Sequence, residues 1–130
     1  MMSRFTFDPT NKVVGVVDDA GDAEAALLAC QNAGFTTDEI EVLTGEEGAQ
    51  QIDAGEVIVH VFSSTQSVPE FYDAPVIAKR IEEELLAGHL LIGVTAKDGD
   101  ARERAREILK SHGGHFINFY GRWAAEALEP

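Results

Sequence analysis

Two histidines near the C-terminus are the residues of this sequence best suited to bind a metal ion. His112 and His115 are separated by two glycines, and two imidazoles at this spacing could hold a transition-metal ion, with His60 and His89 elsewhere in the chain. The pair has no cysteine partner, however. Paired glycines are also what the end of a helix requires, and there His112 would meet free carbonyl groups. We therefore expect no metal and no cofactor, and name His112 and His115 as the residues that would hold a metal.

A polar and aromatic group just beyond these histidines is the best candidate for a ligand-binding site. Alternation along a strand would place Asn118 and Tyr120 on one face. Arg122 could then bind an anion through two hydrogen bonds, and Trp123 would offer a stacking surface. The alternative is that Tyr120 and Trp123 anchor a terminal helix while Arg122 pairs with a surface carboxylate. The sequence favours this packing interpretation, and both interpretations stay open.

Three further residues have structural explanations. Asp18 and Asp19 could act as an acid/base pair, but carboxylates also suit the start of a helix, where they cap backbone N–H groups. Cys30 falls on the inward stripe of a predicted helix, which indicates a small buried side chain rather than a nucleophile. It is the only cysteine, so no internal disulfide can form, which is typical of a reducing compartment. We predict no catalytic residue.

A repeated pattern predicts the elements that position these residues. Residues 14–16 (Val-Gly-Val) recur as 92–94 (Ile-Gly-Val), and residues 21–23 (Gly-Asp-Ala) recur as 99–101 at the same offset. Each copy continues into a helical pattern and then into a short apolar run. A repeat at a fixed offset indicates that one strand–helix–strand unit is built twice. The predicted strands lie at about 12–17, 40–44, 89–95 and 115–120.

The two units predict an α+β fold, a ferredoxin-like sandwich in the order βαβ, helical insert, βαβ. Right-handed crossovers would give a four-stranded antiparallel sheet with two helices on one face, and extra helices would cover part of the other face. The single domain, residues 1–130, then has halves at about 12–44 and 89–120, a helical insert at 45–88 and a C-terminal helix at 121–129. Residues 57–62 stay ambiguous, because their β-branched side chains favour a strand whereas their apolar spacing also fits a helix.

The charge of the chain limits its partners. Ten lysines and arginines stand against 23 aspartates and glutamates, a net charge of −13 that repels phosphate backbones and anionic lipids. The basic residues between positions 97 and 110 are interleaved with acidic ones that largely neutralise them. No apolar stretch approaches the roughly 20 residues that a membrane span requires. We expect a cytoplasmic protein that binds neither nucleic acid nor membranes.

Four blocks of residues resemble those of a known family. They are 14–19 (Val-Gly-Val-Val-Asp-Asp), 33–35 (Ala-Gly-Phe), 42–49 (Val-Leu-Thr-Gly-Glu-Glu-Gly-Ala) and 113–123 (Gly-Gly-His-Phe-Ile-Asn-Phe-Tyr-Gly-Arg-Trp). With these blocks the chain, from about Val13 to Leu128, resembles the bacterial general stress protein domain family. The resemblance implies a small α/β protein with the same duplicated βαβ order and no established activity, and it transfers no catalytic residue. Family members carry more polar and basic residues around 57–67, in a helical stretch, where this chain has an apolar run.

Three functions therefore stay open. The first is a non-catalytic, stress-associated cytoplasmic domain that acts by self-association or partner binding. A homodimer is expected because a four-stranded sheet with one open apolar face is a common dimer surface. The second is a sensor module that binds an unidentified small molecule through Asn118, Tyr120 and Arg122, by analogy of fold alone. The third is a small enzyme with His112 or His115 as a base in a cleft.

Overall fold

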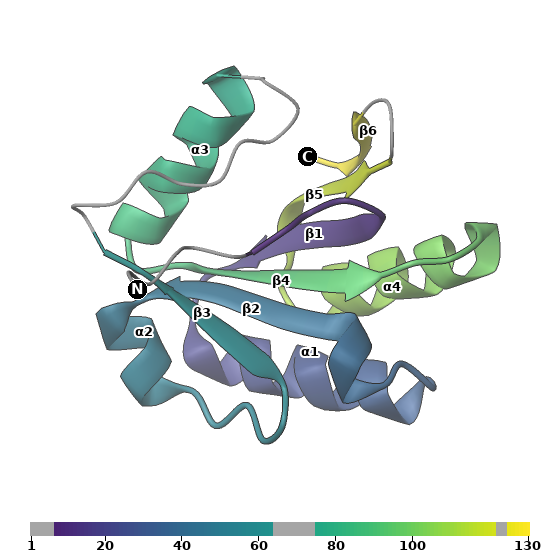
Figure 1. Cartoon of the computed structure of the whole chain (residues 1–130), viewed down its shortest axis with the longest axis horizontal. Helices are drawn as coiled ribbons and strands as arrows, with labels where there is room; N and C mark the ends of the chain where they lie inside the picture. The colour runs from purple at the N-terminus through teal and green to yellow at the C-terminus, as the bar shows by residue number, and fades with distance from the viewer. Residues whose placement is uncertain (1–6, 64–74, 122–124) are drawn as a thin grey trace, which may run out of the picture.

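The computed structural model describes residues 7–63, 75–121 and 125–130, which form an α+β fold with four α-helices and one six-stranded mixed sheet (Figure 1). In chain order the elements are β1 (Lys12–Val17), α1 (Ala20–Asn32), the 3₁₀ helix η1 (Thr37–Glu39), β2 (Ile40–Gly45), α2 (Glu46–Gln51), β3 (Ile58–Phe62), α3 (Pro75–Leu86), β4 (Leu90–Thr95), α4 (Gly99–Ser111), β5 (His115–Tyr120) and β6 (Ala125–Glu129). The strand order across the sheet is β3-β2-β4-β1-β5-β6. The pair β2 and β3 is parallel, and the other neighbouring pairs are antiparallel.

The helices that follow β1 and β4 begin and end in the same way. Asp19 and Asp98 are the N-cap residues of α1 and α4, and each accepts a hydrogen bond of 2.8 Å from the backbone N–H three residues further on. Each helix ends close to a glycine with positive φ, Gly34 at 102° and Gly113 at 81°, in a left-handed conformation that other residues disfavour. The repeated pattern of the sequence thus corresponds to two strand–helix units with matching caps.

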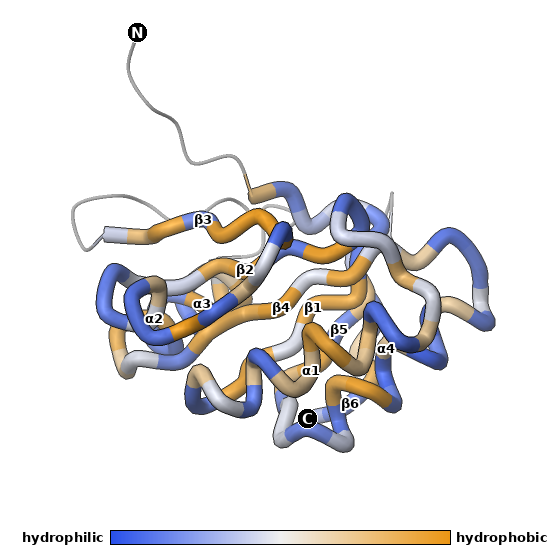
Figure 2. The backbone as a smooth tube through the Cα atoms, turned by 90° about the horizontal axis from the view of Figure 1, so that it is seen from below, coloured by the Kyte–Doolittle hydropathy of each residue, from blue (hydrophilic) through white to orange (hydrophobic). Residues whose placement is uncertain are grey.

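The sheet separates two apolar cores, because successive side chains of a strand point to opposite faces. Val13 and Val17 of β1 join the larger core, under α1 and α4, which also contains Leu109. Val14 and Val16 join a smaller core, under α3. We call these two sides the α1/α4 face and the α3 face. Figure 2 shows β1, β2 and β4 as largely hydrophobic segments inside the molecule, with hydrophilic segments on the helices and turns around them.

Strand β1 lies in the centre of the sheet between two antiparallel neighbours. Val17 lies opposite Leu90 of β4, and Val16 lies opposite His115 of β5. The C-terminal end of β1 is therefore placed between the N-terminal ends of β4 and β5. Side chains at these three strand ends can therefore contact one another when they point to the same face of the sheet.

The sheet is wider than the sequence predicts. It has six strands in the described residues rather than four, because β3 and β6 extend its two edges. The insert at 45–88, predicted to be helical, contains β3 between α2 and α3, and residues 58–62 of the ambiguous run pair with β2 in parallel. The β-branched side chains of this run favour a strand once β2 offers an edge with free backbone groups.

The prediction of a C-terminal helix at 121–129 is wrong, because the structure has the strand β6 at Ala125–Glu129. Strand β6 pairs with β5, and the backbone N–H of Phe116 donates to the carbonyl of Pro130 at 2.7 Å. Arg102 of α4 also reaches Glu126 of β6 at 3.1 Å. A helix of so few residues is marginal by itself, whereas the edge of β5 supplies a partner for each backbone group that faces it.

Candidate functional site

Three polar side chains meet at the end of the sheet where β1 stops and β4 and β5 begin. Asp18 follows β1, His89 precedes β4, and His115 is the first residue of β5. His115 Nε2 lies 2.8 Å from Asp18 Oδ1, and His89 Nδ1 lies 3.6 Å from the same oxygen. The two imidazole rings stand edge to face, with their centroids 6.3 Å apart. The antiparallel register of the three strands is what brings these residues together.

Helix α3 brings a second carboxylate to the same place. Glu84 Oε1 lies 2.6 Å from His89 Nδ1, and Arg80 Nε donates a hydrogen bond of 2.7 Å to Glu84 Oε2. The Arg80 guanidinium also lies over the ring of Phe116, 4.3 Å from its centroid, in cation–π contact. The four residues that share these contacts are called the histidine–carboxylate cluster: Asp18, Glu84, His89 and His115.

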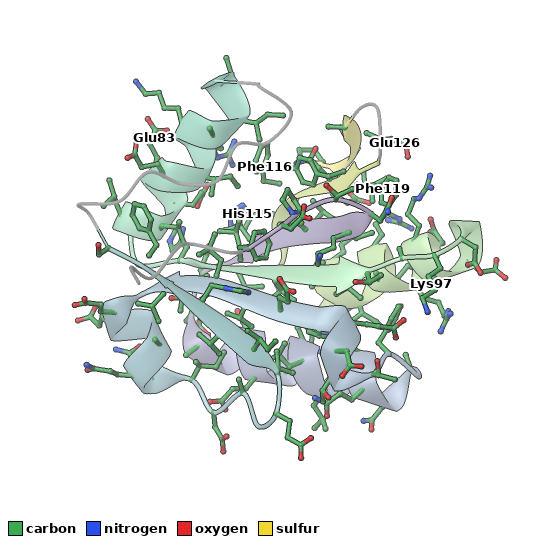
Figure 3. All side chains as sticks on the ribbon, viewed as in Figure 1. Glu83, Lys97, His115, Phe116, Phe119 and Glu126 are labelled. Atoms are coloured by element: carbon green, nitrogen blue, oxygen red, sulfur yellow. The ribbon has the colours of Figure 1, made fainter. Side chains whose placement is uncertain are left out.

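A β-bulge in β5 directs His115 toward the other three residues. Val14 of β1 pairs with Asn118 of β5, and Val16 pairs with His115. One residue of β1 lies between these two pairs but two residues of β5 do, so β5 holds one extra residue. Phe116 has the left-handed φ of 48° at this bulge, which costs a non-glycine residue about 1–2 kcal/mol. If the same residues paired without the bulge, His115 would lie opposite Val17 and point to the α1/α4 face. Figure 3 shows His115 and Phe116 on the side of the sheet where α3 lies.

Hydrogen bonds keep both carboxylates of the cluster ionised. The hydrogen bond from His115 lowers the pKa of Asp18, and the charges of the two histidines act in the same direction. Burial opposes the ionisation of Glu84, but hydrogen bonds from His89 and Arg80 outweigh it, and the pKa of Glu84 is lowered. At neutral pH the cluster thus combines two carboxylates with two imidazoles. These groups can bind a cation or relay a proton.

The structure separates the two histidines that were predicted as a pair. His112 ends α4 and its Nδ1 lies 2.7 Å from the carbonyl oxygen of Ile108, so it meets the free carbonyl groups as expected and lies apart from the cluster. His115 belongs to the cluster instead. The histidine that lies close to His115 is thus His89 and not His112, and metal binding by either predicted histidine stays a prediction.

The predicted ligand-binding group is described only in part. Asn118 and Tyr120 lie on the α3 face, as alternation predicts. Both are buried, and Asn118 Nδ2 donates to the carbonyl of Phe116 at 3.2 Å. Arg122 and Trp123 lie outside the described residues. As a ligand-binding site this group stays a prediction.

Sequence reasoning missed the roles of Asp18, Glu84 and His89. A signal for two of them was available, because Asp18 directly follows one predicted strand and His89 begins the run of another. In the predicted topology these strands are antiparallel neighbours, and their adjoining ends must meet. The carboxylate of Glu84 had no such signal, because its position depends on how α3 packs on the sheet.

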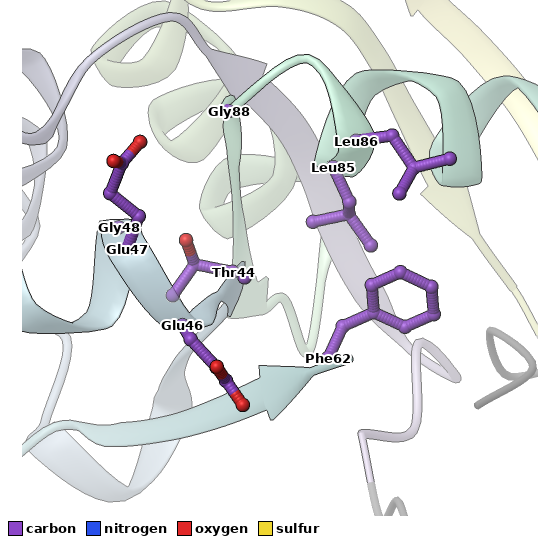
Figure 4. Close-up of a pocket in the computed structure, with 9 residues that line it drawn as sticks. Thr44, Glu46, Glu47, Gly48, Phe62, Leu85, Leu86 and Gly88 are labelled. Carbon is purple, nitrogen blue, oxygen red and sulfur yellow. The ribbon is translucent and has the colours of Figure 1, made fainter. Parts of the chain in front are cut away.

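Apart from the histidine–carboxylate cluster, the structure has a hollow between α2, the end of β3 and the end of α3 (Figure 4). It has a volume of about 200 Å³, and Thr44, Glu46, Glu47 and Leu85 are among its lining residues. The hydroxyl of Thr44 is buried without a hydrogen-bond partner among the described residues. A Cβ at Gly48 would lie 2.1 Å from this hydroxyl oxygen. The Leu-Thr-Gly-Glu-Glu-Gly block thus has a packing explanation, and its two glutamates disfavour an anionic ligand.

Comparisons with known proteins give no match, whether with family models, with curated proteins or with solved structures. The resemblance to the bacterial general stress protein domain family therefore stays a prediction from the sequence. Among the described helices, none is both long enough and apolar enough to cross a membrane.

Proposed function

We propose that this protein is a non-catalytic, stress-associated cytoplasmic domain that acts by self-association, as a homodimer formed through α3. The observation that carries the proposal is the pattern of exposed side chains on this helix. Between positions 76 and 86 the exposed residues are Val76, Lys79, Glu83 and Leu86. Their spacing of three, four and three residues places them in one line along the helix, which we call the α3 stripe. Val76 is 81% exposed and Leu86 is 61% exposed, so both ends of the stripe are apolar.

The α3 stripe is complementary to itself. When two copies of α3 lie antiparallel around a two-fold axis at the level of Ile81, Val76 of one copy faces Leu86 of the other, and Lys79 faces Glu83. Each contact occurs twice. Figure 3 shows Glu83 projecting from α3 away from the sheet, where a second copy can reach it. Two chains of net charge −13 repel each other, so a contact with balanced charges favours their approach.

The size of α3 sets the expected strength of the dimer. The helix has 12 residues, which corresponds to a length of about 18 Å. A pair of such helices buries less than the roughly 800 Å² per partner of a standard stable interface. We therefore expect a reversible dimer whose population depends on protein concentration.

Two observations support a function without catalysis. Burial raises the pKa of the Cys30 thiol to about 12, so this cysteine is not a thiolate nucleophile at neutral pH. Within the described part of the chain, the histidines and carboxylates of the cluster are bonded to each other, and no hydrogen bond joins them to a serine or cysteine nucleophile. The stress association rests on the family resemblance.

We further infer that the four central strands form a ferredoxin-like core to which β3 and β6 are additions. The inference is supported by the order β2-β4-β1-β5, in which each neighbouring pair is antiparallel. It is also supported by α1 and α4, the helices of the two repeated units, which share one apolar core on a single face. Such a core leaves the opposite face free for α3 and the contact proposed here.

Sedimentation velocity over a concentration series tests the dimer. The single variants Lys79→Glu and Glu83→Lys each place like charges opposite one another twice, and we expect dimerisation to weaken by about tenfold or more. The double variant Lys79→Glu/Glu83→Lys restores the order of opposite charges, so we expect wild-type dimerisation. A mixture of the two single variants should form a heterodimer more readily than either forms a homodimer.

Matched apolar substitutions provide the control. Val76→Glu adds a charge to the α3 stripe and should give a monomer. Leu28→Glu adds the same charge to α1, where Leu28 is 59% exposed, and should leave the dimer unchanged. A wild-type protein that stays monomeric at every concentration would contradict the proposal. So would a double variant that dimerises no better than the single variants.

Binding of a small molecule is the second candidate function. A hollow of about 350 Å³, lined by Phe116, Asn118 and residues 127–130 of the C-terminal end, lies within the size range of ligand pockets. A panel of metabolites can be screened by melting temperature, which rises with ligand concentration when the folded state binds. A rise that Arg122→Ala abolishes would favour the sensor. Dimerisation without any rise would favour self-association.

A further inference from the structure

We propose that the histidine–carboxylate cluster binds one divalent transition-metal ion, and that Zn²⁺ fits it best. The inference is independent of self-association. One ligand atom from each of Asp18, His89 and His115 lies within 4.8 Å of the other two. Ligand atoms bound to tetrahedral zinc at about 2.0–2.2 Å lie about 3.3–3.6 Å from one another. The distance from Asp18 Oδ1 to His89 Nδ1 is 3.6 Å, so small rotations of the side chains suffice to admit the ion.

The kinds of ligand in the cluster decide the class of ion. Imidazole nitrogen suits zinc and its transition-metal neighbours, whereas Mg²⁺ and Ca²⁺ prefer sites made of oxygen alone. The cluster has no thiolate, which disfavours Cu⁺. Its two carboxylates balance the charge of a divalent cation when both imidazoles are neutral. The net charge of −13 also favours the approach of cations to the protein.

Glu84 lies beside the three-ligand group formed by Asp18, His89 and His115. Its Oε1 is 2.6 Å from His89 Nδ1, so this carboxylate borders the position of the ion. Its Oε2 accepts a hydrogen bond from Arg80, and hydrogen-bonded carboxylates next to the ligands are a common feature of metal sites. The side chain of Glu84 is 11% exposed, whereas that of Asp18 is 60% exposed. The ion would therefore enter past Asp18.

The β-bulge places His115 within the candidate metal site. The left-handed φ of 48° at Phe116 is unfavourable for an aromatic residue, and its structural consequence is that His115 leaves the strand on the α3 face beside Asp18. Hydrogen bonds between exposed side chains contribute little to stability and do not by themselves account for a strained backbone. In the proposed site the bulge gives His115 a direct role, because it holds Nε2 beside Asp18.

Titration of the metal-free protein with ZnCl₂ by calorimetry tests the site, and Co²⁺ serves as a spectroscopic substitute. We expect one equivalent of Zn²⁺ per chain and a higher melting temperature on binding. Co²⁺ should give the intense visible absorption of a tetrahedral complex, and equal concentrations of MgCl₂ should have no effect. His115→Ala and His89→Ala should each weaken Zn²⁺ binding by about 100-fold or more, and Arg80→Ala by about tenfold.

His112→Ala is the matched control, because His112 lies three residues from His115 and apart from the cluster. This variant should bind Zn²⁺ like the wild type. His115→Asn and His89→Gln provide variants closer in shape, and melting of each metal-free variant shows whether it folds. Repeating the titration with Lys79→Glu, designed to be monomeric, separates this proposal from self-association. Absence of the one equivalent in wild type, or equal losses in His112→Ala and His115→Ala, would overturn the site.

Discussion

The two faces of the sheet differ in the helices and apolar cores that cover them and in the candidate sites that they carry. The α1/α4 face carries two helices from a repeated unit, with matching N-caps and the larger apolar core. The α3 face carries one unrepeated helix, a smaller core, a strained bulge, the histidine–carboxylate cluster and the α3 stripe. The comparison indicates that the α1/α4 face supplies most of the stability, and that the α3 face carries the candidate sites.

The largest expected effect contrasts a leucine from each core. Leu109 is fully buried on the α1/α4 face, and Leu109→Ala should lower the free energy of unfolding by about 4 kcal/mol. Leu85 lies on the α3 face and borders the hollow of about 200 Å³, so Leu85→Ala creates less new cavity and should cost about 2 kcal/mol. Guanidinium denaturation measures both values. Equal costs would mean that the two faces are equally important for stability.

A second effect concerns the tight contact between α2 and β2. Gly48→Ala places a Cβ 2.1 Å from Thr44 Oγ1 and should cost about 1–3 kcal/mol through overpacking. Thr44→Ala removes this oxygen, so the double variant should lose much less stability than the sum of the single variants. A double-mutant cycle from chemical denaturation measures the coupling. Additive losses would show that α2 moves aside instead.

A smaller effect tests the equivalence of the two repeated units. Asp19→Ala and Asp98→Ala each remove an N-cap hydrogen bond of 2.8 Å, and each should cost about 1 kcal/mol. Asp100→Ala, in the first turn of α4 but not at its N-cap, should cost less. Thermal unfolding of the three variants compares them. A clear difference between Asp19→Ala and Asp98→Ala would show that one helix contributes more than the other.

The smallest expected effect is a change of stability with pH, and it concerns Glu39 of η1, the 3₁₀ helix that precedes β2. A hydrogen bond from the Thr36 backbone, with help from Lys97, lowers the pKa of Glu39. Because the unfolded chain then binds more protons in acid, the stabilisation is present above the ordinary carboxyl pKa and is lost as the pH falls through the lowered value. Glu39→Gln should be less stable than wild type at about pH 6, and the difference should shrink as the pH falls through the lowered pKa of Glu39. A constant difference between the two proteins would contradict this assignment.

The repeated units could be predicted because their information is local. Strands at 12–17 and 115–120 have the predicted bounds, since β-branched or aromatic side chains, turn residues and helix caps act within a few positions of one another. The α+β class is likewise confirmed. The segments 58–62 and 125–129 became strands because β2 and β5 have open edges, which is a property of the assembled sheet.

The candidate site could be predicted only in part. The contact between Asp18 and His89 follows from the predicted strand neighbours, and His115 was already a metal candidate. The bulge could not be predicted, because phenylalanine does not favour a left-handed backbone and only the pairing with β1 reveals the extra residue. Glu84 depends on the packing of α3 against β4, which no local pattern specifies.

The extra residue at Phe116 has a consequence for how β5 can change over time. After this residue, Ile117 and Phe119 pack in the apolar core under α1 and α4. Before it, His115 points to the α3 face. Substitutions at His115 and substitutions from Ile117 onward can therefore occur independently, because the bulge separates the side-chain directions of the two parts of β5. In a regular pairing of the same residues, His115 would lie opposite Val17 and point to the other side of the sheet, while the packing of the following residues would stay intact.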